Sequence, residues 1–206
     1  ELSFGVSAWK SWGPSRWALR CNPSSGNLHP VEAYVLAAGL PDLAAGLHHY
    51  DPKDHLLEGR ALRPSTGQRW LAVGLSSAMW REAWKYGERA FRYCQLDIGH
   101  AVGALAYAAA LLGWRIEPLA LASDDQAHLL GLDRAEDFPP GRFAFTEAEE
   151  PEILVALHAP GLAAPPADLA DWPEGATWHG QPSTIDSAPG YRWPVIAQAA
   201  AASRRE

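Results

Sequence analysis

The sequence is poor in cysteine and methionine and has no long run of apolar residues. Among 206 residues there are two cysteines, Cys21 and Cys94, and one methionine. The cysteines form neither a CxxC pair nor a disulfide framework, so we expect a reducing, cytoplasmic environment. The longest apolar stretch, Ala101–Trp114, is shorter than the roughly 20 residues that a membrane-spanning helix needs. The composition therefore argues against disulfide-rich and helical membrane proteins.

An excess of positive charge is also absent. The formal net charge is -7, which argues against nucleic acid as the main partner because phosphate backbones bind basic surfaces. The hydrophobic fraction of 48% and the charged fraction of 20% are those of a folded domain with a core. Because Met79 is the single methionine, residue 1 is not an ordinary initiator. We therefore expect the chain to be a piece of a longer polypeptide.

A run of small and polar residues lies near the start of the chain, in RCNPSSGNLHP (20–30). Its Pro, Ser, Gly and Asn residues cannot continue a helix or a central strand and are typical of a turn. Hydroxyls, a carboxamide and unhindered backbone N–H groups would also let the loop approach a flat polar ligand. Arg16 and Arg20 flank it with charge suited to phosphate. From these residues alone, a structural loop and a binding loop are both open.

Strand and helix signals follow one another along the chain. A short helix is expected within Glu1–Trp12, before Gly13 and Pro14 interrupt it. An Ala-rich helix is expected over Phe91–Trp114, and its second half, apolar all round, is typical of a buried helix. β-forming residues predict strands at Val31–Gly39, on both sides of a turn at Asp51–Asp54, at Trp70–Met79, at Arg115–Ser123 and at Pro151–Ala159. A second, short helix is predicted at Asp124–Leu132.

Three histidines in the hairpin segment, His48, His49 and His55, invite a metal interpretation. The segment has the pattern of an exposed hairpin, and no closed set of ligands accompanies it. We therefore predict no metal site.

The character of the chain changes after Pro160. Residues 161–206 contain repeated prolines together with Trp172, Trp178 and Trp193, and they lack a sustained periodicity. We interpret residues 1–160 as the main domain and residues 161–206 as a Trp/Pro-rich arm or linker toward a second unit. The tryptophans are expected to need a partner surface on which to bury.

Three segments in this order, NPSSGNLHP, HHYDPKDHLLE and REAWKYGERAFRYCQLDIGHAVGALAYAAALLGW, closely resemble the flavin-dependent nitroreductase superfamily. The nearest branch is the SagB-type dehydrogenases, which include azoline oxidases, and the resemblance covers roughly residues 16–160. It implies an α+β, nitroreductase-like fold in which an antiparallel-dominated sheet is enclosed by helices. It also implies FMN in a cleft between two such units, formed by a homodimer or by an intramolecular pseudo-dimer.

The resemblance also implies roles for particular residues. Pro23, Ser24, Ser25 and Asn27 match the loop that lies against the flavin in the family. Arg16 and Arg20 lie where the family has basic residues that hold the FMN phosphate. Lys85 and Tyr86 match the pair that serves proton transfer in the azoline oxidases. The function implied is an FMN-dependent oxidoreductase that transfers hydride to flavin N5 from a small-molecule or peptide-derived substrate.

Lysine and tyrosine both titrate near pH 10, so one member of the pair must have a lowered pKa to act as a base. We expect burial and three arginines to supply this effect, namely Arg81, Arg89 and Arg92. The alternative is that Lys85 and Tyr86 only end a helix before Gly87. One helical turn separates Asp97 from His100, so these two side chains are candidates for a pair.

Two departures from the family pattern favour a different function. No Arg-Arg-Ser run precedes the loop, and WRIEPLALAS (114–123) replaces the glycine-rich segment that commonly follows the long helix. The alternative is a non-catalytic, nitroreductase-like half that supports a second, flavin-bearing domain.

Overall fold

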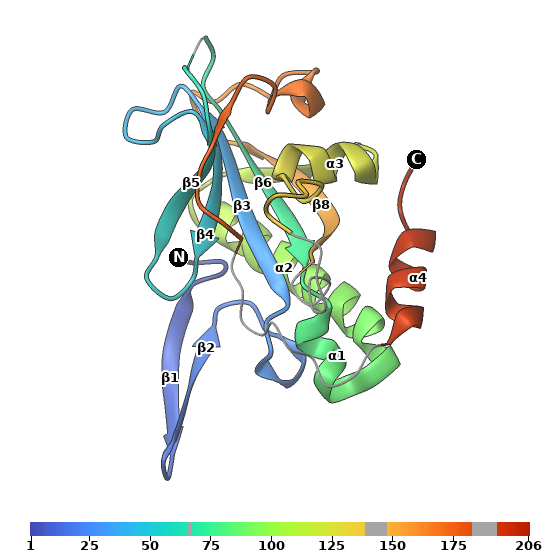
Figure 1. Ribbon diagram of the computed structural model, residues 1–206. Coiled ribbons are helices and arrows are strands. Elements are labelled where there is room, and N and C mark those ends of the chain that lie inside the picture. Colours follow the sequence, from blue (N-terminus) through green and yellow to red (C-terminus); the bar gives the residue numbers. More distant parts are fainter. Residues whose placement is uncertain (66, 139–147, 183–192) are drawn as a thin grey trace.

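The computed structural model describes residues 1–65, 67–138, 148–182 and 193–206, and its centre is a seven-stranded antiparallel sheet (Figure 1). The strand order is β7-β8-β6-β3-β4-β5-β9. The strands are β3 (Val31–Ala38), β4 (Gly46–Asp51), β5 (Leu56–Leu62), β6 (Trp70–Ser77), β7 (Arg115–Pro118), β8 (Glu150–His158) and β9 (Thr177–Trp178). This antiparallel sheet, flanked by helices, confirms the predicted α+β class.

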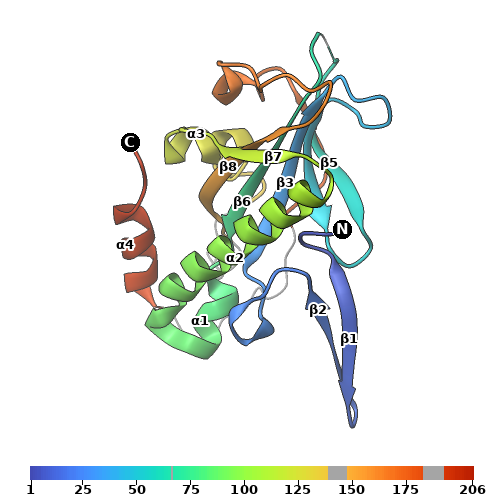
Figure 2. The same cartoon turned by 180° about the vertical axis from the view of Figure 1, so that it is seen from behind.

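The two faces of the sheet are covered by different helices. Side chains alternate along β3, so Val31 and Ala33 point to one face and Tyr34 and Leu36 to the other. The long helix α2 (Ala90–Leu111) crosses the first face (Figure 2). Helix α3 (Ser123–Leu130) packs on the second. The remaining helices are α1 (Trp80–Tyr86), α4 (Pro194–Ala202) and the short 3₁₀ turns η1 (Ser25–Asn27), η2 (Gly87–Arg89) and η3 (Leu169–Asp171).

Strand pairing brings the polar loop beside α1. The loop leads into β3 and α1 follows β6, and these two strands are antiparallel neighbours in which Val31 pairs with Ser77. The Ala78 backbone N–H donates to the Pro30 carbonyl at 2.8 Å. Segments about fifty positions apart in the sequence therefore meet at one end of the sheet.

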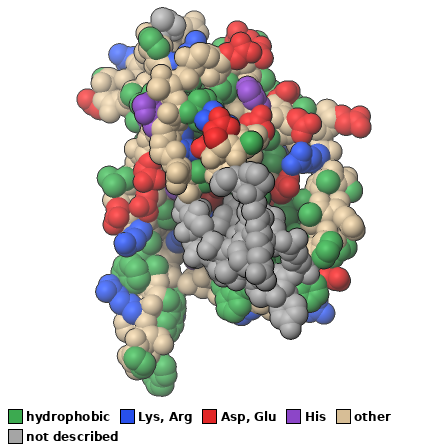
Figure 3. Space-filling view, viewed as in Figure 1, with side chains coloured by type: hydrophobic (Ala, Val, Ile, Leu, Met, Phe, Trp, Pro, Cys, Tyr) green, Lys and Arg blue, Asp and Glu red, His purple; other side chains and the backbone are tan. Residues whose placement is uncertain are grey.

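The chain begins with a hairpin, so the prediction of a short helix in residues 1–12 is wrong. Strands β1 (Val6–Trp12) and β2 (Ser15–Arg20) form a separate antiparallel pair. Gly13 has a φ of 55° at the first position of the two-residue turn, a conformation that glycine adopts without cost. The hairpin projects from the body, and hydrophobic side chains gather over it (Figure 3). Trp9 and Trp12 are 48% and 82% exposed.

The histidine-bearing hairpin occurs as predicted, but its first strand is not exposed. Strand β4 lies inside the sheet between β3 and β5, and His48 and His49 are buried. His48 Nε2 lies 2.9 Å from the Ala44 carbonyl, and His55 Nδ1 lies 2.9 Å from the Tyr50 hydroxyl. These histidines therefore have partners within the fold.

The second half of α2 is not buried on all sides. Ala101 and Leu105 face the sheet, whereas Tyr107 and Leu111 are each 78% exposed. Leu112 follows the helix and is also exposed. The helix therefore presents an apolar outer face in this chain.

The segment after Pro160 packs against the domain where the structure describes it. Strand β9 pairs with β5, and α4 places Ile196 beside Cys94 of α2. Trp172 packs edge-on against Trp70, with ring centroids 5.2 Å apart. Trp178 packs against the same core, so these tryptophans do not need a partner chain, contrary to the expectation. Residues 183–192 lie outside the described residues, and a connection to a second unit stays a prediction.

Candidate functional site

One buried carboxylate holds the polar loop. Asp97 of α2 accepts a hydrogen bond from the Ser24 hydroxyl at 2.5 Å, and its other oxygen accepts the Ser25 hydroxyl at 3.1 Å. The Ser25 backbone N–H also donates to it at 3.0 Å. Asp97 is fully buried. The suggested pair with His100 is therefore wrong, because Asp97 binds the loop instead. His100 is exposed, and among the described residues it makes no hydrogen bond with Asp97.

The rest of the loop is also tied internally. Asn27 donates through Nδ2 to the Ala18 carbonyl at 2.9 Å, and its Oδ1 lies 3.1 Å from His29 Nε2. The His29 backbone N–H donates to the Ser24 hydroxyl at 2.8 Å. Gly26, Asn27 and His29 all have positive φ angles, of 61°, 61° and 52°. The fold thus holds two non-glycine residues in a costly conformation, a feature that clusters at functional sites.

The loop and the Lys-Tyr pair meet at Gly26. A β-carbon added to Gly26 would stand 2.5 Å from the Tyr86 hydroxyl and 2.8 Å from Lys85 Nζ. Two predicted site elements, distant in the sequence, therefore converge on one point. The ring of Tyr86 also packs on Tyr93 of α2, with centroids 4.6 Å apart.

Lys85 is not buried, contrary to the expectation. Nor do the three arginines surround it as expected. The Arg81 guanidinium is buried in an ion pair with Glu32 of β3, whereas Arg89 and Arg92 are exposed. In this chain alone, Lys85 therefore has neither the desolvation nor the arginine cluster that we invoked for a base.

The two arginines predicted to bind phosphate lie in different surroundings. Arg16 stacks over the Trp9 ring at 4.4 Å on the projecting hairpin. Arg20 lies at the base of the hairpin, about 13 Å further along the strand. Burial and the Arg20 charge lower the pKa of His29 to about 4, so the field of Arg20 reaches the loop. Pro23 is exposed at the start of the loop.

Sequence reasoning missed a second buried acid, Glu82 of α1. Its side chain is fully buried, and neither carboxyl oxygen has a hydrogen-bond partner among the described residues. Burial and the nearby Asp97 raise the pKa of Glu82 to about 8, although Lys85 opposes the shift. The sequence did carry a signal for its burial, because Glu82 is three residues after the apolar Met79, which is buried, and residues at this spacing lie on the same side of a helix.

A buried ionic network lies behind the site. His49 contacts Glu32 at 2.8 Å and Glu58 at 3.0 Å. Burial opposes the charge of Glu32, but Arg81 and His49 lower its pKa to about 2. Burial likewise opposes the charge of His49, but the hydrogen bonds and charges of the two glutamates raise its pKa to about 9. The network therefore fixes the start of β3 to α1 through opposite charges.

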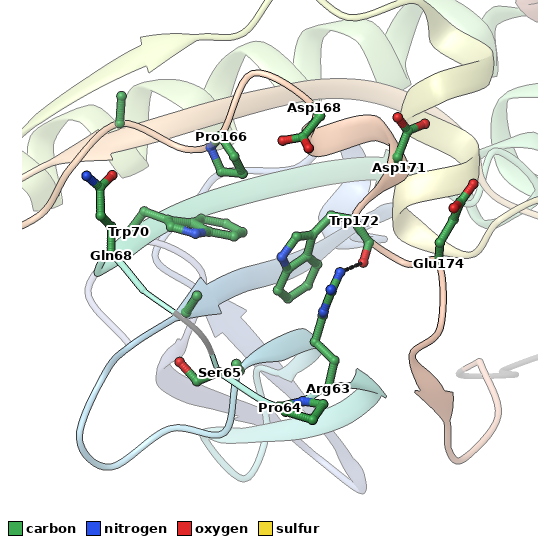
Figure 4. Close-up of a pocket in the computed structure, with 13 residues that line it drawn as sticks. Arg63, Pro64, Ser65, Gln68, Trp70, Pro166, Asp168, Asp171, Trp172 and Glu174 are labelled. Carbon is green, nitrogen blue, oxygen red and sulfur yellow. Dashed lines mark hydrogen bonds between the residues drawn. The ribbon is translucent and has the colours of Figure 1, made fainter.

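A cavity of about 500 Å³ lies at the other end of the sheet (Figure 4). Trp70 and Trp172 are among the residues that line it, and Arg63 donates to the Trp172 carbonyl at 2.5 Å. It opens near the end of β3, about 23 Å along that strand from Val31. No predicted site residue lines it, so we place the candidate site at the loop and α1 instead.

Within the described ranges, no group of three His, Cys, Asp or Glu side chains is arranged to hold a metal ion. In the same part of the chain, no helix is both long enough and apolar enough to cross a bilayer.

Comparison with known proteins gives structural relatives only. No family model matches the sequence, and no curated protein does. A predicted nitroreductase of Anabaena variabilis matches with a TM-score of 0.61 and 24% identity, over 86% of this chain and 35% of that chain. The Escherichia coli microcin synthetase complex McbBCD, solved with truncated pro-MccB17 bound, matches with a TM-score of 0.58 and 18% identity, over 77% and 60%. A predicted nitroreductase of Ralstonia eutropha matches with a TM-score of 0.51 and 19% identity, over 70% and 63%.

The chain thus spans about a third of the first of these chains and about three fifths of the other two. The identities are low, but the matches cover most of this chain, with the antiparallel sheet and its helices. The chain therefore has the α+β fold of the nitroreductases.

Proposed function

We propose that this chain is part of an FMN-dependent oxidoreductase of the SagB-type dehydrogenase branch of the nitroreductases. The observation that carries the proposal is the convergence of Gly26 with Lys85 and Tyr86. The structural similarity to the microcin synthetase complex, solved with truncated pro-MccB17 bound, supports a peptide-derived substrate. We further propose a cytoplasmic protein in which a second nitroreductase-like unit completes the site.

The residues present fit a flat, anionic cofactor in three respects. Gly26 lets the polar ends of Lys85 and Tyr86 come close to the loop, and a larger residue there would push them away. Arg20 supplies positive charge next to the loop. Ser24 and Ser25 are fixed by Asp97, so the loop is a rigid support, and we assign the flavin contacts to its outer surface with Pro23 and Asn27. Arg16 is assigned to the phosphate only through the family resemblance.

In such a reaction the substrate loses a hydride and a proton from adjacent atoms. FMN, when bound, supplies the hydride acceptor at N5. Lys85 accepts the proton, and Tyr86 orients the substrate or relays the proton. Because Lys85 is exposed in this chain, the second unit must cover it to exclude water.

The second candidate function is a non-catalytic half that supports a flavin-bearing partner. One specific observation favours it. The Ser24 and Ser25 hydroxyls and the Asn27 amide all have partners within the chain, so the loop is stable without a ligand.

The visible spectrum of the purified full-length protein separates the two functions, because bound flavin absorbs in the visible range. The variant Gly26→Ala then tests the site, since its methyl group would displace Lys85 and Tyr86. Gly113→Ala is the matched control: Gly113 also has a positive φ, 71°, but nothing lies within 4 Å of an added β-carbon. We expect the first variant to lose flavin and the control to keep it. A colourless parent protein favours the supporting half, and equal flavin content in both variants contradicts the assigned site.

A further inference from the structure

Glu82 lies behind the candidate site with no hydrogen-bond partner for its carboxyl group among the described residues. Its side chain is fully buried on α1, and both oxygens lack hydrogen bonds among the described residues. An ionised carboxylate in such a place is strongly unfavourable, whereas a neutral carboxylic acid is tolerated. The location therefore selects the protonated form.

The neighbours of Glu82 belong to the site. Lys85 and Tyr86 are three and four residues further along α1, so they share its side of the helix. From α2, Asp97 lies close enough for its charge to act on Glu82, and a charge on Glu82 would in turn raise the pKa of the buried Cys94 thiol. Asp97 and Cys94 bring no positive charge, and Lys85 is the one cation among these neighbours.

The protonation of Glu82 affects what Asp97 can do. Asp97 accepts the hydroxyl and N–H bonds of Ser24 and Ser25, and such bonds are strongest when the acceptor is a carboxylate. A second carboxylate beside it would repel it in a region that excludes water. This repulsion is relieved only if α1 or the loop moves so that water can reach Glu82.

We propose that Glu82 is a positioning residue of the site, which as a neutral acid keeps the Ser24–Ser25 loop on Asp97 and so keeps Gly26 against Lys85 and Tyr86. When Glu82 loses its proton, the loop is released from α2. The significance for catalysis rests on the proposed function, but the coupling between Glu82 and the loop is a property of this chain without cofactor.

The sign of the pH dependence follows from linkage. Burial, followed by the Asp97 charge, raises the pKa of Glu82 from 4.5 to about 8 in the closed form. The closed form therefore binds its proton more tightly than an open, hydrated form. The free energy by which Glu82 disfavours the closed form is absent below about pH 4.5, grows as the pH rises, and levels off above about pH 8. In that window the opening equilibrium changes by up to about tenfold for each pH unit.

The test is amide hydrogen exchange of the segment 22–30 in the full-length protein without flavin, corrected for the intrinsic pH dependence of exchange. We expect loop opening in the parent to increase about tenfold or more between pH 6 and pH 8. Glu82→Gln cannot ionise and should show a flat profile with higher protection at pH 8. Glu82→Leu, similar in volume and also uncharged, should show the same flat profile, and it replaces Glu82→Gln in the test if that variant does not fold. Glu88→Gln, at an exposed site just after α1, should retain the parental profile.

Two results would overturn the proposal. One is a parental loop whose protection does not change between pH 6 and pH 8. The other is a Glu82→Gln profile that keeps the parental slope. Glu149 would then be the group that controls the loop if Glu149→Gln removes the slope, because burial and the Glu32 charge also raise the pKa of Glu149, to about 7. Failure of the protein to bind flavin would contradict the proposed function and leave this exchange result valid on its own.

Discussion

Ser25 and Asp97 are joined by two hydrogen bonds to one oxygen. The Ser25 backbone N–H donates to Asp97 Oδ1 at 3.0 Å, and the Ser25 hydroxyl donates to the same atom at 3.1 Å. The partners are 72 residues apart in the sequence. The polar loop is therefore not an independent surface turn, because the long helix on the sheet fixes its position.

This attachment gives a first prediction. Asp97→Asn keeps an acceptor oxygen but removes the charge that strengthens the bonds from Ser24 and Ser25. Hydrogen bonds to charged groups contribute about 1.5–3 kcal/mol each, so we expect the free energy of unfolding to fall by about 2–3 kcal/mol. Urea denaturation measures it. The control Asp54→Asn, in an exposed turn, should change it by less than about 0.5 kcal/mol. Equal effects of the two substitutions would mean that Asp97 does not stabilise the loop.

The same bonds change what should be expected of a bulky residue in the loop. Ser25→Leu would keep the backbone N–H donor but remove the hydroxyl donor from Asp97 and place a bulky apolar side chain beside its buried charge, so flavin affinity and stability should fall together. That variant cannot separate binding from folding. Gly26→Ala is the sharper probe, because the atoms nearest to its methyl group belong to Lys85 and Tyr86.

Much of the fold follows from local sequence. Apolar β-forming runs predicted β3, β6 and β8, and an Ala-rich pattern predicted α2 within a few residues. The N-terminal hairpin was missed because Gly13-Pro14 was interpreted as the end of a helix, although the same pair makes a tight turn. The exposed side of α2 was missed because a helix that is apolar on every side does not reveal which side faces the sheet.

The site was predictable in its parts but not in its assembly. Spacing alone does not show that Gly26 meets Lys85 and Tyr86, since the contact depends on the pairing of β3 with β6. Asp97 occupies a core position of α2, between the buried Cys94 and Ala101. An acid at such a position signals a buried polar contact, and its partner became clear only from the fold.

A second prediction concerns pH and His49. The pKa of His49 is raised from 6.5 to about 9, so its charge stabilises the fold fully below pH 6.5, and that contribution is lost as the pH rises through 9. His49→Gln carries no charge. The difference in unfolding free energy between the parent and His49→Gln should be largest near pH 6 and should shrink by pH 10.

Denaturant titrations at several pH values measure this difference. His100→Gln serves as the control because His100 is exposed on α2. Its difference from the parent should stay constant over the same range. A pH-independent difference for His49→Gln would show that the Glu32–His49 contact does not depend on the histidine charge.

A third prediction concerns assembly. Apolar side chains are uncovered on the outer face of α2, with Tyr107 and Leu111, and on the β1–β2 hairpin, with Trp12. A two-stranded hairpin is marginally stable in water by itself, and clustered apolar side chains mark interaction sites. We expect these surfaces to bury against a second nitroreductase-like unit, either another copy or another half of the same polypeptide.

Sedimentation velocity over a range of concentrations tests this expectation. Leu111→Glu should weaken self-association by tenfold or more, a loss of about 1.4 kcal/mol. Leu56→Glu, at a 56% exposed leucine of β5, should leave association unchanged. If the chain alone is a compact monomer at every concentration, both surfaces have been misinterpreted for this chain.

The last prediction assigns the proton. Lys85→Met keeps most of the length of the side chain but removes its charge and basicity. Flavin should remain bound and reducible by dithionite, whereas reduction by substrate should slow by roughly 10²–10⁴-fold, the usual contribution of a positioned general base. Tyr86→Phe should cost less if Tyr86 only orients the substrate. Lys53→Met, in an exposed turn, is the matched control and should react at the parental rate. The measurement is anaerobic single-turnover bleaching of the flavin against pH, with an azoline surrogate as substrate. If Lys85→Met bleaches as fast as the parent, Lys85 does not remove the proton, and its place beside Gly26 serves only to end helix α1.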